Sequence, residues 1–470
     1  MINVFKIKEM KKLSILFLLV ALSLGGCKKI LDVNDDPNRP IDVQESLILP
    51  PVELAISDYL YAGNANIILQ DWIQSTAPNQ PNPGLWNYQA FNVNWDSDWY
   101  NAYVVCLNNL QLLDAKATLS GNTNYGAIAK ILKAYSLAYA TDLWGDIPYS
   151  AAFNGTQNLT PVYDKQEDIY KEIQSLLDNA IADVNKDYTI KPGSDDFYYN
   201  GDMDAWKKLA YTLKARYYMH LTKAPGYTAA AQAALALAAL ENGMTANADD
   251  LKMAYSGGAG SENPWNLTFG PVSTKVLNAT FVETLRTRND PRLTKMVAPA
   301  IETGLYTGRR IGSALGNLES YSLGSNYYSG ETASTYLMTY TEAEFIKAEA
   351  TLIVSGAAAA QSIYVDGITN HMNRLGVASS DITSYLAARG TLNQATALQQ
   401  IIEEKSVANF LSTETYNDWR RTGFPVLTKV DGALSDIPRR AMYPQTELTT
   451  NPQPQQTAKI TDRVWWDATN

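Results

Sequence analysis

The chain of 470 residues has a formal net charge of −10, with 46% hydrophobic and 18% charged residues, two cysteines and two histidines. This composition excludes a disordered protein, and the acidic charge argues against nucleic acid as a partner because phosphates would be repelled. With so few thiols and imidazoles, we expect no zinc site and no histidine-dependent nucleophile. No metal-ligating residue and no cofactor is predicted, and the sequence leaves open whether a structural cation is bound.

The first predicted element is typical of exported proteins. Four lysines at positions 6, 8, 11 and 12 precede an apolar run, LSILFLLVALSLGGC, at Leu13–Cys27. The run is shorter than the ~20 apolar residues that a permanent membrane helix needs, and its layout is that of a secretory signal. Its end, Leu24-Gly25-Gly26-Cys27, resembles a bacterial lipobox and predicts cleavage of residues 1–26 and lipid attachment at Cys27. The alternatives are an ordinary signal peptide with an incidental cysteine, or a buried helix.

Residues 27–45 are predicted to be the lipidated N-terminus and a polar tether, because KKILDVNDDPNRP is polar and contains two prolines. An EF-hand loop is rejected there, since Pro37 and Val43 occupy positions that need glycine and glutamate. Residues 46–470 are then predicted to form a single domain. Cys106 is its only thiol, so no intramolecular disulfide can form, and we expect this cysteine to be buried and inert in a helix.

Hydrophobic spacing near 3.6 residues predicts helices along most of this domain. The pattern turns helical at Ser46, and Pro51 could open a helix from its first turn. Helix pairs of about 34 residues resemble tetratricopeptide units, although the strict consensus of that repeat is absent. We expect His220 and His371, each within a helical pattern, to be structural. The other predicted helices span residues 66–76, 95–116, 125–142, 166–183, 204–222, 228–242, 340–355, 359–375 and 393–412.

Three irregular stretches, residues 77–94, 253–273 and 304–335, each place aromatic side chains beside amides. Flat aromatic faces suit the apolar side of a sugar ring and amides suit its hydroxyls, so the three loops predict a composite ligand-binding site. The alternative is that each aromatic residue anchors its own loop to the core. The candidate ligand-binding residues are Trp86, Asn87, Tyr88, Asn263, Trp265, Asn266, Tyr327 and Tyr328.

A helical glycoside hydrolase is an alternative function. That chemistry needs two carboxylates that face each other across a cleft. Acidic residues one or two positions apart on a helix point in different directions, so we expect such pairs to be solvated faces and predict no catalytic residues. A tetratricopeptide-type scaffold that binds only protein is harder to exclude. The acidic pairs of this kind are Asp96 with Asp98, Glu342 with Glu344, and Glu403 with Glu404.

Seven segments in order along the chain resemble the SusD/RagB family, and most closely its branch of SusD-like nutrient-binding outer-membrane lipoproteins. Within them we expect the tryptophans at 144, 206 and 419 to pack in the core. We expect the arginines at 420, 421, 439 and 440 to make structural hydrogen bonds. The segments are LDVNDDPNRP, DLWGDIPYSAA, MDAWKKLAYTLKARYYMHL, YTEAEFIKAEA, EEKSVANFLSTETYNDWRRTGFP, IPRRAMYPQTELTTNP and RVWWD.

The resemblance implies an all-α fold, built on a tetratricopeptide-like helical scaffold with long irregular ligand-binding loops. It also implies a lipoprotein on the extracellular face of the outer membrane. Such a protein would capture a nutrient, in the first instance an oligosaccharide, and pass it without catalysis to a SusC-like TonB-dependent β-barrel transporter. A peptide-binding member of the same family is the alternative, followed by the hydrolase.

Overall fold

The computed structural model describes residues 43–186, 188–270, 273–389, 391–454 and 458–468. The predicted signal peptide, Cys27 and nearly all of the predicted tether lie outside the described residues. The chain divides into two compact units, residues 1–44 and 45–470, and the fold below is that of the second unit. No helix among the described residues combines the length and the hydrophobicity that a membrane span requires.

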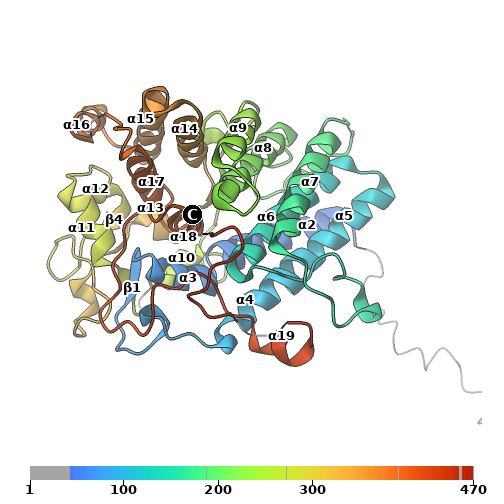
Figure 1. Cartoon of the computed structure of the whole chain (residues 1–470), viewed down its shortest axis with the longest axis horizontal. Coiled ribbons are helices and arrows are strands. Elements are labelled where there is room, and N and C mark those ends of the chain that lie inside the picture. The colour runs from blue at the N-terminus through green and yellow to red at the C-terminus, as the bar shows by residue number, and fades with distance from the viewer. Residues whose placement is uncertain (1–42, 187, 271–272, 390, 455–457, 469–470) are drawn as a thin grey trace, which may run out of the picture. The chain divides into compact units, whose positions relative to one another are not determined.

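The second unit is mostly helical, which confirms the predicted all-α fold (Figure 1). Two π-helical turns, η2 (Ile56–Tyr61) and η5 (Asn101–Leu107), extend α2 and α4. The helices are α2 (Glu45–Ala55), α3 (Asn64–Trp72), α4 (Asp96–Tyr100), α5 (Asn108–Ser120), α6 (Thr123–Trp144), α7 (Gln166–Val184), α8 (Met203–His220), α9 (Ala229–Leu240), α10 (Pro264–Thr268), α11 (Ala279–Thr287), α12 (Leu293–Met296), α13 (Asn326–Ser329), α14 (Tyr340–Ser355), α15 (Ala357–Arg374), α16 (Ser379–Arg389), α17 (Ala397–Ala408), α18 (Glu414–Thr422) and α19 (Gln445–Thr450).

Three small antiparallel sheets of two strands each tie the irregular stretches together. They pair β1 (Thr76–Pro78) with β3 (Lys275–Leu277), β2 (Leu251–Met253) with β6 (Thr335–Met338), and β4 (Val297–Ala298) with β5 (Leu323–Gly324).

The long helices form a row in which each packs against the next. α5 to α9 follow one another, α9 packs on α14, and α14 pairs with α15, as Figure 1 shows across the upper part of the view. Nearly all of α6 is buried, and its small residues, among them Ala127, Ala134 and Ala138, let α5 and α7 approach closely. Gly367 of α15 serves the same purpose, since a Cβ there would lie 3.0 Å from the ring of Phe345.

Several local predictions need correction. Pro51 does not open a helix, because both Pro50 and Pro51 lie inside α2. No helix is predicted beyond residue 412, whereas the tail contains α19. The sequence analysis also missed α18, ETYNDWRRT, whose polar residues are nearly all buried. Apolar periodicity cannot reveal a helix that is buried through ion pairs instead of hydrophobic side chains.

The acidic pairs are not solvated faces, because at least one carboxylate of each pair is buried, and both are buried in the pair Glu342 and Glu344. Asp98, Glu342 and Glu404 are each at most 2% exposed. Asp98 accepts a hydrogen bond from the backbone N–H of Ala65, which lies in the first turn of α3. Glu404 binds the buried guanidinium of Arg292 at 2.6 Å. Long-range cations and backbone donors therefore bring these acids into the core.

Six of the buried charges alternate in sign along one chain of contacts, which we call the buried ion network. It joins α8, α14, α17 and α18, and it confirms the structural role expected of Arg421. Each charge has an opposite partner within about hydrogen-bond distance, which is the condition for keeping ions in a low-dielectric interior. The network runs Arg216–Glu342–Lys405–Asp418–Arg421–Glu349, with Arg216 to Glu342 at 2.7 Å and Lys405 to Asp418 at 2.9 Å.

Candidate functional site

The predicted residues of the first loop are largely held by the chain itself. Asn87 is buried and donates to the carbonyl of Gly432 at 2.7 Å. Tyr88 is also buried and adopts a left-handed backbone conformation with φ of 74°. Trp86 is half-buried, and its Nε1 donates to Oδ1 of Asn82 at 3.0 Å. Of the three, only Trp86 keeps ring surface that a ligand could reach.

The second and third predicted loops come together. Asn263 is fully buried and donates to the carbonyls of Tyr328 and Ala333, both at 3.0 Å. Asn266, one turn further on, donates to the carbonyl of Ser329 at 2.9 Å. The amide side chains of the α10 loop therefore fix the α13 loop. The hydrogen bonds of residues 84–88 run elsewhere, to the ring of Trp72 and to residues 82 and 430–434.

The aromatic residues of these two loops differ in exposure. Trp265 is 2% exposed, and Tyr328 is buried with its ring edge-on to Phe410 at 5.0 Å. Tyr327 is half-buried and stacks on Tyr336, with ring centroids 5.9 Å apart. Of the eight predicted residues, Trp86, Asn266 and Tyr327 thus remain partly exposed, and the other five lie in the interior.

A cleft that the sequence analysis did not predict lies beside the C-terminal segment 463–465. Its volume is about 360 Å³, within the usual range for a small-ligand site. Three of the family-like segments contribute to it, DLWGDIPYSAA, IPRRAMYPQTELTTNP and RVWWD, but nothing in the sequence shows that they meet, because they are far apart along the chain. The lining side chains that carry charge or an aromatic ring are Asp146, Tyr163, Lys165, Arg440, Tyr443, Arg463 and Trp465.

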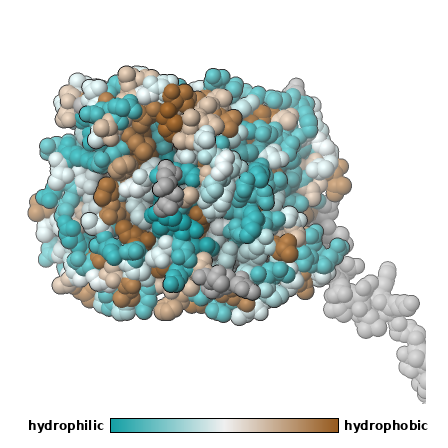
Figure 2. All heavy atoms as spheres, viewed as in Figure 1, coloured by the Kyte–Doolittle hydropathy of each residue, from teal (hydrophilic) through white to brown (hydrophobic). Residues whose placement is uncertain are grey.

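A second cleft of about 380 Å³ shares Arg463 with the first, so the two adjoin. Trp419, Lys429, Asp436 and Arg439 also line it. Among the described residues, Arg463 is the charged side chain that lines both clefts, and its side chain is 38% exposed. We refer to the two together as the Arg463 groove. Figure 2 shows hydrophilic and hydrophobic residues interspersed over one face of the molecule.

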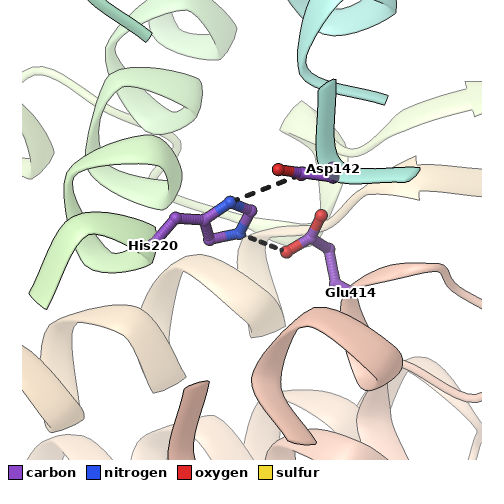
Figure 3. Close-up of side chains that lie close together, drawn as sticks. All are labelled: Asp142, His220 and Glu414. Carbon is purple, nitrogen blue, oxygen red and sulfur yellow. Dashed lines mark hydrogen bonds and ion pairs between the residues drawn. The ribbon is translucent and has the colours of Figure 1, made fainter. Parts of the chain in front are cut away.

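His220 lies in a buried cluster with two carboxylates (Figure 3). Its Nε2 is 2.9 Å from Glu414 of α18, and its Nδ1 is 3.5 Å from Asp142 of α6. The hydroxyl of Tyr170 lies 2.8 Å from the same Nδ1 and donates to Asp142 at 2.5 Å. The indole of Trp466 donates to Asp142 at 2.8 Å. The cluster therefore joins α6, α7, α8 and α18 to the C-terminal segment.

The cluster does not fit a metal ion, although one ligand atom from each of its three residues lies within 4.8 Å of the others. The carboxylates face opposite nitrogens of the His220 ring, as Figure 3 shows, whereas one ion can take only one of them. Arg420 donates to the Asp142 carbonyl, so a cation would also meet a positive charge. We interpret the cluster as a hydrogen-bonded structural histidine.

The surroundings act in opposite directions on the two carboxyl groups of this cluster. Burial raises the pKa of Asp142, although the charges of His220 and Arg420 offset part of the effect. For Glu414 burial acts in the same direction, but His220 and Arg216 outweigh it and keep the pKa well below its usual range. Glu414 is therefore the more firmly ionised of the two.

A family model described as starch-binding proteins associating with the outer membrane, SusD-like, matches residues 37–444. The chain belongs to the SusD-like family. No curated protein matches it. Among solved structures, one described as a chitin-binding protein is 26% identical, with a TM-score of 0.78, and the match covers 91% of this chain and 100% of that one.

Two further SusD-like structures show the same fold. A SusD/RagB family protein from Bacteroides thetaiotaomicron is 24% identical, with a TM-score of 0.78 and coverage of 91% of this chain and 100% of the other. A chitin-binding SusD homologue from Flavobacterium johnsoniae is 23% identical, with a TM-score of 0.78 and coverage of 91% and 99%. These matches confirm two predictions: that the chain belongs to the SusD-like family, and that it has the all-α fold of that family.

Proposed function

We propose that this SusD-like protein captures an oligosaccharide at the outer membrane and passes it, chemically unchanged, to a SusC-like TonB-dependent transporter. The observation that carries the proposal is the family match over residues 37–444, whose description joins starch binding to the outer membrane. A solved structure described as chitin-binding, 26% identical to this chain, supports a saccharide ligand. Lipid attachment at Cys27, on the extracellular face, would keep the protein beside its transporter.

Within the predicted site we propose that Trp86, Asn266 and Tyr327 contact the ligand, because these three residues are partly exposed. The five buried residues would act by positioning the loops. Asn263 is the clearest example, since its side chain donates to two carbonyls of the α13 loop and accepts from the backbone N–H of Trp265. This division keeps the predicted site and gives its members different roles.

The buried carboxylates on either side of His220 are consistent with binding without hydrolysis. Asp142 and Glu414 are both buried, and His220 lies between them. The cavity that they line together is about 20 Å³, enough for one water molecule and far too small for a sugar ring. These two carboxylates therefore cannot act on a glycosidic bond.

Isothermal titration of the full chain in detergent with malto- and chito-oligosaccharides, followed by chromatography of the mixture, tests this function. We expect saturable binding and no shortened product. Trp86→Ala should reduce the affinity by about 1–3 kcal/mol, the contribution of one large apolar side chain. Tyr100→Ala, which removes an exposed ring on α4, is the matched control and should change nothing.

Three results would contradict the proposal. Released shorter sugars would indicate a hydrolase, and saturable binding of peptides alone would indicate the peptide-binding alternative. If Trp86→Ala and Tyr327→Ala both bind as wild type does, the site is elsewhere. Trp265→Ala is a poor probe, because removal of a 2% exposed tryptophan should cost about 3–5 kcal/mol of stability whatever its role in binding.

A further inference from the structure

We propose that the Arg463 groove binds uronic acid units of an oligosaccharide, with Arg463 pairing a carboxylate and Trp465 packing on a sugar ring. This inference rests on the proposed saccharide-binding function and narrows its ligand class to acidic glycans. It concerns a site separate from the predicted loops at α10 and α13. The argument follows from the charge, the free donors and the aromatic rings of the groove.

The first cleft has more positive than negative charge on its walls. Lys165 pairs with Asp146 at 2.7 Å near the surface, so these two neutralise each other. Arg440 is different, because its guanidinium donates to the carbonyl oxygens of Trp144 and Ala441. Among the described residues no carboxylate forms an ion pair with Arg440. Arg440 is buried and these carbonyls use its donors, so it contributes positive potential to the cleft wall but no direct contact to a ligand.

Arg463 adds a second positive group with free donors. Its Nη1 binds Asp467 at 2.8 Å, but Asp467 is also held by Arg439 at 2.6 Å, so two cations share one carboxylate. Within the described part of the chain, Nε and Nη2 of Arg463 have no hydrogen-bond partner. A planar carboxylate can accept two parallel hydrogen bonds from one guanidinium, and these two nitrogens are the pair that remains available.

The aromatic residues favour a sugar over a small inorganic anion. Trp465 is half-buried and held edge-on by Tyr227 at 5.7 Å. Tyr163 is half-buried and held edge-on by Tyr443 at 5.3 Å. Trp99 also stacks on Tyr163 at 6.4 Å, and the Tyr163 hydroxyl donates to Glu447 at 2.8 Å, so this ring is held in place by the protein. Trp465 is therefore the ring that keeps apolar surface at the cleft for a sugar. Apolar ring faces beside a guanidinium match the apolar face of a sugar that carries a carboxylate.

The size of the groove is consistent with more than one sugar unit. The two clefts measure about 360 and 380 Å³ and meet at Arg463. Lys429 lies in the second cleft and pairs with the exposed Asp436 at 2.8 Å, so the excess positive charge is concentrated at Arg440, Arg439 and Arg463. A uronate oligomer would therefore place one carboxylate near the junction of the clefts.

Isothermal titration of the full chain in detergent with a galacturonate oligomer and with neutral malto- and chito-oligomers of equal length tests this inference. We expect the acidic oligomer to bind more tightly, and to lose affinity as the salt concentration rises. Arg463→Gln should weaken its binding at least about tenfold, the effect of losing one charge-assisted contact. Arg463→Lys keeps the charge but not the planar guanidinium, so its affinity for the acidic oligomer should lie between those of the wild type and of Arg463→Gln.

The controls separate this inference from the proposed function. Arg310→Gln removes an exposed arginine that pairs with Glu283 outside the groove, and it should not change any binding. If neutral oligomers bind and the galacturonate oligomer does not, or if it binds equally to Arg463→Gln, the inference is wrong and the proposed function stands. If no saccharide in the panel binds, the proposed function fails with it.

Discussion

The buried ion network and the Arg463 groove both contain arginine–carboxylate pairs, but the arginines are fully paired in the network and incompletely paired in the groove. In the network, Arg421 contacts both Glu349 and Asp418, and all three are buried. In the groove, Arg463 shares Asp467 with another arginine and presents two nitrogens without a hydrogen-bond partner among the described residues. Both regions pair arginine with carboxylate, but only the Arg463 groove leaves positive charge that a ligand can reach.

This difference separates structural charge from binding charge. A buried charge that lacks a partner costs several kcal/mol, so a stable interior must be closed to further partners. A partly exposed charge can remain incompletely paired because water solvates it until a ligand arrives. By the same criterion the Asp142–His220–Glu414 cluster is structural. Its carboxylates accept hydrogen bonds from Tyr170, Trp466 and Asn417 and have little capacity left for a ligand.

The largest expected effect comes from opening the network. Arg216→Met removes the guanidinium that donates to both carboxylate oxygens of Glu342, at 2.8 and 2.7 Å. Burial already raises the pKa of Glu342 despite Arg216. Without that partner, Glu342 must take up a proton or stay as an uncompensated charge. We expect the free energy of unfolding to fall by about 3–5 kcal/mol in urea titrations. If the free energy of unfolding fell by no more than it does when an exposed arginine is replaced, the network would contribute little to stability.

A smaller effect should appear as a pH dependence at Asp98, which lacks a cationic partner among the described residues. Burial raises its pKa to about 6, and hydrogen bonds from Asn64 and Ala65 offset only part of the shift. Because the folded state then binds the proton more tightly than the unfolded state, this group's contribution to stability decreases as pH rises from about 4 to 6, and is constant above.

Asp98→Asn removes that titration while keeping an oxygen for the Ala65 N–H. The difference in unfolding free energy between wild type and variant should therefore change by about 2–3 kcal/mol between about pH 4 and pH 6.5, in favour of the variant at the higher pH. Denaturant titrations at several pH values measure it. A constant difference across this range would mean that Asp98 titrates normally in the folded protein.

The sequence predicted the fold better than the site, for a physical reason. The pair α14–α15 and the long α6 are rich in alanine and other apolar residues that favour a buried helix, and their bounds differ little from the predicted ones. α18 was missed because its burial depends on ion pairs. Likewise the burial of Glu342 depends on Arg216, which is 126 positions away, so no local pattern could indicate it.

The loops show the same limit. Aromatic residues beside amides correctly marked the stretches around α10 and α13 as distinct from the helical scaffold, but Asn263 uses its amide to join those stretches. The sequence could not show that segments near 146–165, 440–443 and 463–465 form a cleft, because that depends on tertiary packing. Residue type indicated binding chemistry, whereas free donors and exposure had to come from the structure.

The smallest expected effect is the control for the first prediction. Arg310→Met removes an exposed arginine whose Nη2 binds Glu283 at 2.7 Å, with side chains 60% and 42% exposed. Water solvates both groups when the pair is broken, so the loss in unfolding free energy should stay below about 1 kcal/mol. Arg216→Met and Arg310→Met make the same chemical change, the first in a buried ion pair and the second in an exposed one. Equal losses in urea titrations would contradict the distinction between structural and available charge, and the reason for assigning a ligand to Arg463 would then be lost.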